Sequence, residues 1–421
     1  MRGLAGFRAI PRTLAHRNFG IYVAGNSISL IGTWMQRIGV GWLAWQLSES
    51  GAVLGLVAFA DLFPTIVIGP IGGALADRLD RRRVLMVAQS LIMLQAITLA
   101  LLTATGLITV ELLLALVLFS GAIIGFNQPA RLALVPNLVP RSHLATAVAI
   151  NSVVFNSARF IGPALAGIVI VWFGIAAVFA LNALSFLAFL LALSRLRLPG
   201  TGRPRGARQG SLFGAVGEGL RYALGHPGLG PILLVHAALA VSSRPFVELL
   251  PGFAAEVFGR GASGLAMLSS AVGIGAVAGG LWLAQRDDQA GLPRLVLTSS
   301  FLVTLTILGF ALSPWFLLGL VFVTLAGIGM VSAGVSTQTV LQMSVEETMR
   351  GRVLSLFGLI FRGGPAVGAL AMGAASESMG FQAPLAIGAL LGTLACFLTW
   401  RRRRPIIAAL AGSRPGPAGC S

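Results

Sequence analysis

Apolar runs of about 20 residues recur along the whole chain, and this recurrence limits the folds that the chain can adopt. A helical run of that length spans the hydrocarbon layer of a bilayer. Twelve such runs are present, separated by shorter polar segments. The sequence therefore predicts an all-α membrane protein with twelve transmembrane helices in two pseudo-symmetric six-helix bundles. The expected spans cover residues 19–47, 53–76, 84–105, 110–129, 144–173, 176–196, 229–254, 262–284, 295–312, 315–343, 353–375 and 384–400.

The composition excludes an ordinary soluble domain. Hydrophobic residues make up 56% of the 421 residues and charged residues only 10%, against roughly 25% charged residues in typical globular proteins. The net charge of +17 comes from 30 basic residues, all of them arginine, but no soluble domain offers a basic face for nucleic acid. Cys396 and Cys420 are the two cysteines, so neither a disulfide framework nor a thiolate metal site is expected. We expect no cofactor and no metal.

Arginine is concentrated on one side of the expected membrane helices. Because basic residues that flank membrane spans stay in the cytoplasm, we expect this side and both termini to be cytoplasmic. The apolar run after the N-terminal arginines is long and lacks a small-residue cleavage site, so a removed signal peptide is not expected. The opposite side carries one arginine, Arg260, with the acidic residues Glu49, Glu111, Glu256 and Glu377.

The two halves of the chain resemble each other. Arg37 and Arg244 are 207 residues apart, and ARFIGPALAG matches IFRGGPAVGA at an offset of 202. A segment rich in Gly, Pro and Arg separates the halves as a solvated linker, and LFGAVGEGLRYAL after it predicts an amphipathic surface helix. Parallel repeats are typical of transporters with a substrate site between the halves. The expected parts are a cytoplasmic N-terminus (1–17), a bundle (18–196), a linker (197–228), a second bundle (229–400) and a cytoplasmic tail (401–421).

The stretch GGALADRLDRRRV follows the second expected span. It resembles the signature loop of the major facilitator superfamily in Gly73, Asp77, Arg78, Arg81 and Arg82, whereas Asp80 stands where that family usually has a second glycine. The glycine lets two helices approach closely, and Asp77 can bind a helix N-terminus and arginine partners as a latch that opens during transport. Anchoring of the cytoplasmic side is the alternative, and it explains the basic cluster.

Three further segments narrow the resemblance, namely residues 32–47, 126–167 and 337–370. They are similar to a branch of bacterial exporters that includes the enterobactin-exporter type and drug:proton antiporters. In that branch Gly162, Pro163 and Gly167 resemble the antiporter motif, which relaxes the fifth helix at the seam between halves; ordinary close packing is the alternative. The resemblance implies a monomeric exporter of the bacterial inner membrane that moves drug-like or siderophore-like molecules, amphipathic or anionic, by alternating access and proton antiport.

Charged residues lie inside the expected spans, where an ionisable group costs about 2.5–3.5 kcal/mol. Arg37 and Asp61 are equally far from the turn between the first two spans, so we expect them to pair at the same depth. Arg244 and Glu248 are four residues apart on the seventh span and are expected to pair too, although Pro245 can distort that helix. A static salt bridge is the alternative for both pairs.

These residues suggest a transport site. Asp61 or Glu248 would carry the coupled proton, because a carboxylate beside a separable arginine can exist in two protonation states. Arg159 and Arg362 each precede a Gly-Pro element and would favour an anionic substrate, unless backbone carbonyls or polar neighbours satisfy them. His236 is either a polar packing residue or a proton relay. The expected cavity residues are Arg37, Arg159, Arg244, Arg362 and His236.

The sequence lacks the motifs of a membrane enzyme. It contains no zinc-binding His-Glu helix, no phosphate-binding Gly-Lys-Ser/Thr loop and no serine nucleophile with a nearby base. We therefore expect a transporter rather than an enzyme or an ATP-driven pump. An importer or uniporter of the same fold, and a membrane sensor or scaffold without transport, are the alternatives.

Overall fold

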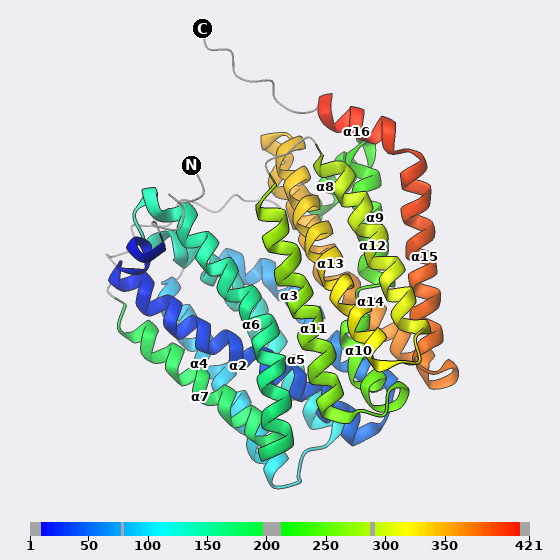
Figure 1. Cartoon of the computed structure of the whole chain (residues 1–421). Helices are drawn as coiled ribbons and strands as arrows, with labels where there is room; N and C mark the ends of the chain where they lie inside the picture. The colour runs from blue at the N-terminus through cyan, green and yellow to red at the C-terminus, as the bar shows by residue number, and fades with distance from the viewer. Residues whose placement is uncertain (1–9, 77–79, 197–211, 287–290, 413–421) are drawn as a thin grey trace. The chain divides into compact units, whose positions relative to one another are not determined.

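The computed structural model describes residues 10–76, 80–196, 212–286 and 291–412, and every regular element in these ranges is helical (Figure 1). The chain divides into two units. The first comprises Met1–Glu49, Leu56–Arg208 and Gly259–Gly273, and the second comprises Ser50–Gly55, Gln209–Phe258 and Ile274–Ser421. Two helices, α3 and α11, have residues in both units.

In the first unit, long helices follow one another with short connections. Helix α2 packs against α6 and α7, and α4 packs against α5 and α7. The two 3-10 turns η1 (Val135–Asn137) and η2 (Arg141–His143) connect α5 to α6. The long helices are α2 (Arg17–Ser48), α3 (Gly51–Ala76), α4 (Arg81–Ala104), α5 (Val110–Leu134), α6 (Leu144–Phe173) and α7 (Ile175–Ser194).

The second unit repeats the same pattern of helix pairs. Helix α9 packs against α14 and α15, and α12 packs against α13 and α15. These pairs match those of α2 and α4 in the first unit, so the internal repeat of the sequence is present in the packing. The helices are α8 (Leu212–Gly225), α9 (Leu229–Ser242), α10 (Phe246–Gly252), the π-helical turn η3 (Phe253–Val257), α11 (Gly261–Ala284), α12 (Leu292–Leu312), α13 (Phe316–Ser344), α14 (Glu347–Met379), α15 (Gln382–Arg401) and α16 (Arg403–Gly412).

Among the described residues, 11 helical segments are long and apolar enough to cross a membrane. Helix α2 is not one of them, although it has 32 residues, because polar residues such as Asn26, Gln36 and Arg37 lower its mean hydropathy. The 11 segments and α2 correspond to the twelve apolar runs of the sequence. The amphipathic helix expected after the linker is confirmed as α8, whereas α16 was not expected from the sequence.

The seventh apolar run is not the single continuous helix that its sequence predicts. Helix α9 ends before Arg244, and α10 begins after it, with η3 following directly. Pro245 has no backbone N–H and cannot continue the helical ladder. The N–H of Arg244 instead donates to the carbonyl of Leu239 at 3.0 Å. Arg244 therefore lies in a break between two helices, and regular i,i+4 spacing does not relate it to Glu248.

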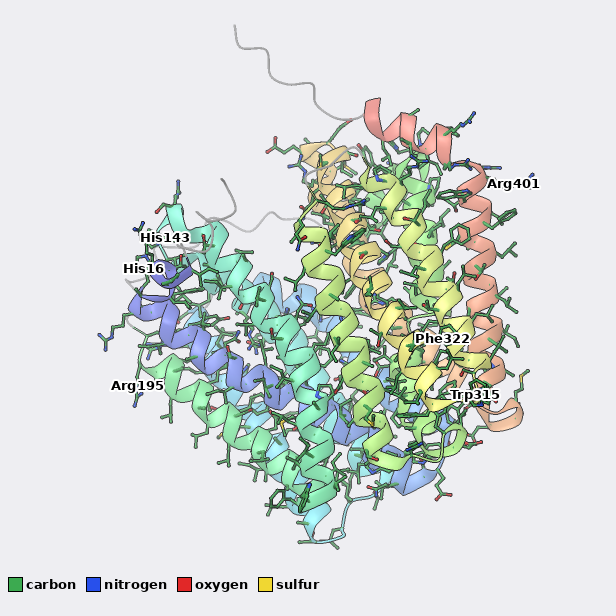
Figure 2. All side chains as sticks on the ribbon, viewed as in Figure 1. His16, His143, Arg195, Trp315, Phe322 and Arg401 are labelled. Carbon is green, nitrogen blue, oxygen red and sulfur yellow. The ribbon has the colours of Figure 1, made fainter. Side chains whose placement is uncertain are left out.

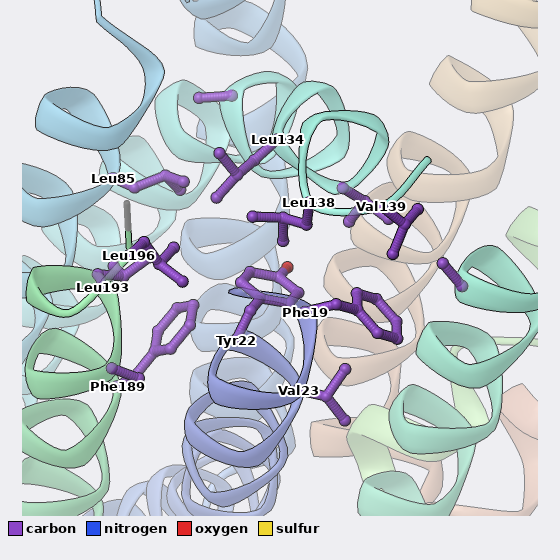
Figure 3. Close-up of a cluster of buried hydrophobic side chains, with 14 of the residues drawn as sticks. Phe19, Tyr22, Val23, Leu85, Leu134, Leu138, Val139, Phe189, Leu193 and Leu196 are labelled. Atoms are coloured by element: carbon purple, nitrogen blue, oxygen red, sulfur yellow. The ribbon is translucent and has the colours of Figure 1, made fainter. Parts of the chain in front are cut away.

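Buried hydrophobic side chains fill one end of the first unit (Figure 3). The rings of Tyr22 on α2 and Phe189 on α7 meet edge to face with centroids 5.8 Å apart. Leu85, Leu134 and other aliphatic side chains from α4, α5 and α6 pack around them. Because lipid tails are as apolar as leucine, close packing rather than water exclusion holds helices together inside a bilayer. This cluster therefore fixes α2, α4 and α7 by the fit of its side chains.

A chain of buried amides connects the same three helices. The amide of Asn182 on α7 donates to the Oε1 of Gln36 on α2 at 2.7 Å, and the Nε2 of Gln36 donates to the Oε1 of Gln95 on α4 at 3.1 Å. Ser185 donates to the Oδ1 of Asn182 at 2.9 Å. Polar side chains in a membrane interior gain from bonding across helices. This amide chain sets the register of α2, α4 and α7.

Candidate functional site

The first unit contains the ion pair that the sequence predicts. The Nη1 of Arg37 on α2 lies 3.5 Å from the Oδ2 of Asp61 on α3. The side chains are 32% and 27% exposed, so neither is sealed in the core. A Cβ on Gly121 of α5 would lie 2.6 Å from the carbonyl oxygen of Asp61. Close approach of α5 therefore holds the backbone that carries the carboxylate.

Trp34 brings a second arginine to this pair. The guanidinium carbons of Arg37 and of Arg159 on α6 each lie 5.6 Å from the centroid of the Trp34 ring. Phe155, also on α6, meets the same indole edge to face with centroids 6.0 Å apart. A guanidinium over an indole is attracted by the ring quadrupole. Arg37, Asp61 and Arg159 thus form one site around Trp34, which we call the Trp34 site.

The contact of α6 with α2 explains how Arg159 reaches Trp34. A Cβ on Gly162 would lie 2.5 Å from the Cβ of Trp34 and 3.0 Å from the carbonyl oxygen of Ile31. Only glycine fits there, so α6 meets α2 one turn after Arg159. Pro163 is buried inside α6. Close helix packing is therefore one function of this Gly-Pro element.

Gly167 makes a second close helix contact, in the same unit. Its Cα faces the Cβ of Ala266 on α11, with no space for a side chain on the glycine. Both glycines expected to relax the fifth helix at a seam are therefore points of tight packing. Whether they also allow movement during transport stays a prediction.

The second unit has a matching contact between α9 and α14. A Cβ on Gly364 would lie 3.1 Å from the backbone carbon of Ala240, and a Cβ on Gly368 would lie 2.5 Å from the Cγ of Pro245 and 2.9 Å from the backbone carbon of Val241. Arg362 is partly buried on α14, two residues before Gly364, and Glu248 is partly buried on α10. The two Gly-Pro elements of the sequence repeat thus occupy equivalent packing positions.

Aromatic rings and two basic side chains gather at this second contact. The guanidinium carbon of Arg244 lies 3.9 Å from the ring centroid of Phe361, and its Nη1 lies 3.5 Å from the carbonyl oxygen of Phe361. The imidazole of His236 lies 4.7 Å from the ring of Phe357 and 6.3 Å from that of Phe361. We call Arg244, His236, Phe357 and Phe361 the Phe361 site.

The signature loop is described only in part. Asp77 and Arg78 lie outside the described residues, Gly73 lies near the end of α3, and Arg81 begins α4. Asp80 is the N-cap of α4 and accepts a hydrogen bond from the N–H of Arg83 at 3.0 Å, which explains an acidic residue where the superfamily usually has glycine.

Arg82 of the same loop binds the end of another helix. Its Nε donates to the carbonyl of Leu193 at 2.8 Å, and its Nη2 donates to that of Ser194 at 2.5 Å. A cation is favourable at a helix C-terminus, where carbonyls are left without partners. Arg82 therefore joins α4 to α7, a contact beyond the membrane anchoring expected for the basic cluster.

Two histidines meet away from both sites. The rings of His16 and His143 lie edge to face with centroids 4.8 Å apart (Figure 2), and the hydroxyl of Thr13 lies 2.9 Å from the Nδ1 of His143.

In the second unit, His226 precedes α9, and its Nδ1 accepts hydrogen bonds from the N–H groups of Gly228 at 3.0 Å and Leu229 at 3.2 Å. Burial lowers the pKa of His226, which favours the neutral ring that can accept these bonds.

Residues 12–415 match the family of transmembrane secretion effectors. The chain belongs to this family. Transmembrane secretion effectors are transporters of the major facilitator superfamily, so the family resemblance seen in the sequence is confirmed. The protein is a multi-pass membrane transporter of an exporter family and not an enzyme.

Relatives of known function support the same assignment. The enterobactin exporter EntS of Citrobacter koseri is 30% identical over 339 residues, which cover 80% of this chain and 78% of the relative. The staphyloferrin A transporter of Staphylococcus aureus is 23% identical over 360 residues, which cover 85% of this chain and 89% of the relative.

Solved structures show the same fold. A bacterial homologue of the human lysosomal transporter Spinster, inward-facing and unoccupied, matches with a TM-score of 0.70 at 15% identity, over 96% of this chain and 99% of that one. A POT family transporter in complex with 5-aminolevulinic acid matches with a TM-score of 0.71 at 12% identity, over 93% and 96%. These matches confirm the predicted twelve-helix, two-bundle fold of this transmembrane secretion effector.

The sequence did not lead us to expect aromatic residues at either site. Trp34 precedes Arg37 by three residues, a helical spacing that places the two on one face, and Phe361 directly precedes Arg362. An aromatic residue at helical spacing from an intramembrane arginine was therefore a usable signal for Trp34. Among the described residues of this secretion effector, no three His, Cys, Asp or Glu side chains are grouped as metal ligands.

Proposed function

We propose that this secretion effector exports anionic, siderophore-like small molecules across the bacterial inner membrane by alternating access, driven by inward proton flow. The observation that carries the proposal is the partly exposed Arg37–Asp61 ion pair next to Arg159. The relatives named as an enterobactin exporter and a staphyloferrin A transporter support the substrate class. An amphipathic drug-like substrate is the alternative within the same family.

The Trp34 site brings two basic side chains together with one acidic side chain. The guanidinium groups of Arg37 and Arg159 lie over one indole, and the carboxylate of Asp61 pairs with Arg37. A planar guanidinium binds carboxylate through two parallel hydrogen bonds, and such bonds are strong where water is scarce. Two guanidinium groups at one site therefore favour an anionic substrate over a cationic one.

Asp61 is our first candidate for the coupled proton. A neighbouring guanidinium favours the ionised carboxylate, whereas a carboxylate in an apolar environment that is separated from its arginine favours the protonated form. Opening of the 3.5 Å contact between Arg37 and Asp61 would thus let the carboxylate bind a proton, and closing of the contact would release it. Glu248 on α10 is the second candidate, with Arg244 in the adjacent helix break as its proposed partner.

The arginine distribution sets the proposed orientation. Both termini and the linker at 197–228 are placed in the cytoplasm, since the basic residues gather on that side. The proposed bundles cover residues 18–196 and 229–400. Protons entering from the periplasm would then drive export, and we expect the transporter to act as a monomer.

Transport by inside-out membrane vesicles tests the function. Vesicles containing the full chain are energised to acidify their lumen, and uptake of enterobactin, staphyloferrin A and a hydrophobic cation is compared with uptake by vesicles without the protein. We expect accumulation of at least one of the two siderophores and its loss when an ionophore collapses the pH gradient. Uptake of neither siderophore, or uptake that is insensitive to the ionophore, would contradict the proposal.

A further inference from the structure

The break in the seventh apolar run places a guanidinium against an aromatic face inside the membrane. Arg244 lies between α9 and α10, and its guanidinium carbon is 3.9 Å from the centroid of Phe361. In membrane transporters, irregular backbone at membrane depth occurs where it is buried in protein or lines a cavity. Phe361 is 38% exposed, so part of its ring remains accessible beside the guanidinium.

His236 lies beside the rings of Phe357 and Phe361 and has a ring nitrogen without a hydrogen-bond partner among the described residues. His236 is 5% exposed, and among the described residues its Nε2 has no hydrogen-bond partner. Its ring is nearly parallel to that of Phe361, with 11° between the planes, and lies 4.7 Å from Phe357. A buried polar atom without a partner costs about 1–3 kcal/mol. A ligand that supplies a hydrogen-bonding group would recover that cost.

The helix contact behind these side chains is close. Gly364 and Gly368 of α14 lie against Ala240 and Val241 of α9, with no room for side chains. The elements that carry His236 and Phe361 thus pack tightly against each other within one unit. A preorganised set of side chains binds a ligand with less loss of conformational entropy.

From these observations we infer that the Phe361 site is a binding subsite for a planar aromatic anion. The anionic group pairs with the guanidinium of Arg244, the aromatic ring packs against the exposed part of Phe361, and a polar substituent bonds to the Nε2 of His236. Guanidinium and aromatic groups together select ligands that are both flat and negatively charged. The inference rests on the proposed function only in taking this ligand to be part of the exported molecule.

Binding to the purified full chain in lipid nanodiscs, without any gradient, tests the subsite. The probe is 2-naphthoate, compared with decahydronaphthalene-2-carboxylate, which keeps the charge but is not flat, and with 2-naphthylmethylammonium, which keeps the ring but reverses the charge. We expect 2-naphthoate to bind about tenfold more tightly than either comparison compound, as an aromatic contact and a charge pair each contribute. Equal affinity for the three compounds would overturn the inference, whatever the variants show.

Three variants locate the binding. Arg244→Gln removes the charge, Phe361→Leu removes the aromatic face, and His236→Phe keeps a packed ring but removes Nε2. We expect about a tenfold loss of 2-naphthoate affinity for the first two. The third is measured with 6-hydroxy-2-naphthoate, which adds a polar substituent that 2-naphthoate lacks, and we expect a smaller loss for this probe. Arg286→Gln is the matched control, because the guanidinium of Arg286 lies 4.5 Å from the Trp282 ring in another part of the second unit. An equal loss in the control would place the binding elsewhere.

The outcome is separable from that of the transport assay. If siderophore uptake follows the proton gradient but 2-naphthoate does not bind selectively, the subsite is wrong and the transport proposal stands. If 2-naphthoate binds selectively and depends on Arg244 while vesicles show no proton-driven uptake, the subsite stands and the proposed function is wrong.

Discussion

The Nη1 of Arg37 lies 3.5 Å from the Oδ2 of Asp61, and about a third of each side chain remains exposed. Because the pair is not sealed by packing, breaking it should cost less than roughly 3–5 kcal/mol, the cost of breaking a fully buried pair. The contact can therefore open at low cost. An ion pair that opens easily is suited to changing partners during transport and is less suited to a purely structural salt bridge.

We expect Asp61→Asn to abolish accumulation driven by a pH gradient while leaving downhill exchange of the substrate intact. The amide keeps the shape of the carboxylate but cannot take up and release the proton. Uptake by inside-out vesicles, with and without the gradient, measures both activities. Glu248→Gln is the paired variant, and gradient-driven accumulation by both variants would show that these carboxylates do not couple transport to protons.

Trp34→Leu is expected to weaken transport of an anionic substrate more than transport of a neutral one. The substitution removes the indole that lies 5.6 Å from both guanidinium carbons, so Arg37 and Arg159 lose their common support. Each cation–π contact is worth about 0.5–2 kcal/mol, and we expect an increase in the KM for anions of about threefold or more. Arg159→Gln should change KM in the same direction. Equal losses for anionic and neutral substrates would indicate a purely structural role.

We expect Gly162→Ala to destabilise the first unit. The added methyl group would lie 2.5 Å from the Cβ of Trp34 and near backbone atoms of α2, which cannot move aside as a flexible side chain can. Overpacking of this kind costs about 1–3 kcal/mol. Thermal denaturation in detergent measures the change. Gly358→Ala on α14 is the control, because no described atom lies within 4 Å of the position that its methyl group would take, and it should melt at or slightly above the wild-type temperature.

Most of the fold was predictable because the length of an apolar run is enough to identify a membrane helix. Residues 144–173 were expected as one span and form α6 with the same bounds. Helix ends were less predictable where charged residues continue a helix beyond the apolar run, as at Glu347 in α14. The break at Arg244 was foreseen only as a distortion by Pro245, since the sequence does not show which carbonyl accepts the displaced N–H.

Only the Arg37–Asp61 pair of the candidate site was predictable, because two residues equally far from one turn lie at the same depth in the membrane. Arg37 and Asp61 are equally far from Glu49, and they do pair. The aromatic neighbours of Arg159 and Arg244 were not predictable, because they lie on another helix and the apolar pattern does not show which helices pack side by side. Phe361, and the contact of Trp34 with Arg159, therefore emerged only with the tertiary structure.

We expect protonation of His226 to make the stability of the folded protein depend on pH. Burial lowers its pKa below the usual value, and the neutral Nδ1 accepts two N–H groups at the start of α9. Because the folded state disfavours the charged ring, this contribution is complete above the pKa of the unfolded chain, about 6.5, and is lost as the pH falls below it. We expect the melting temperature to fall between pH 7.5 and pH 5.5 by more in the wild type than in His226→Ala. The same fall in both proteins would contradict the role of His226.

The last prediction concerns the amide chain of the first unit. Asn182 is fully buried and donates to Gln36 at 2.7 Å, so Asn182→Leu leaves the Oε1 of Gln36 without this donor in an apolar setting. We expect a loss of about 1–2 kcal/mol, seen as a lower melting temperature in detergent.

A double-substitution cycle separates this bond from simple packing. Gln36→Leu combined with Asn182→Leu removes both partners, and the double variant should lose less stability than the sum of the two single variants, because no orphaned amide remains between them. Asn156→Leu is the matched control, since the amide of Asn156 donates at 2.8 Å to the carbonyl of Ser152 on its own helix, and it should melt near the wild-type temperature. Strictly additive losses from the two single substitutions would mean that the amides of Gln36 and Asn182 contribute independently, and that the register of α2 and α7 is set by the surrounding hydrophobic packing instead.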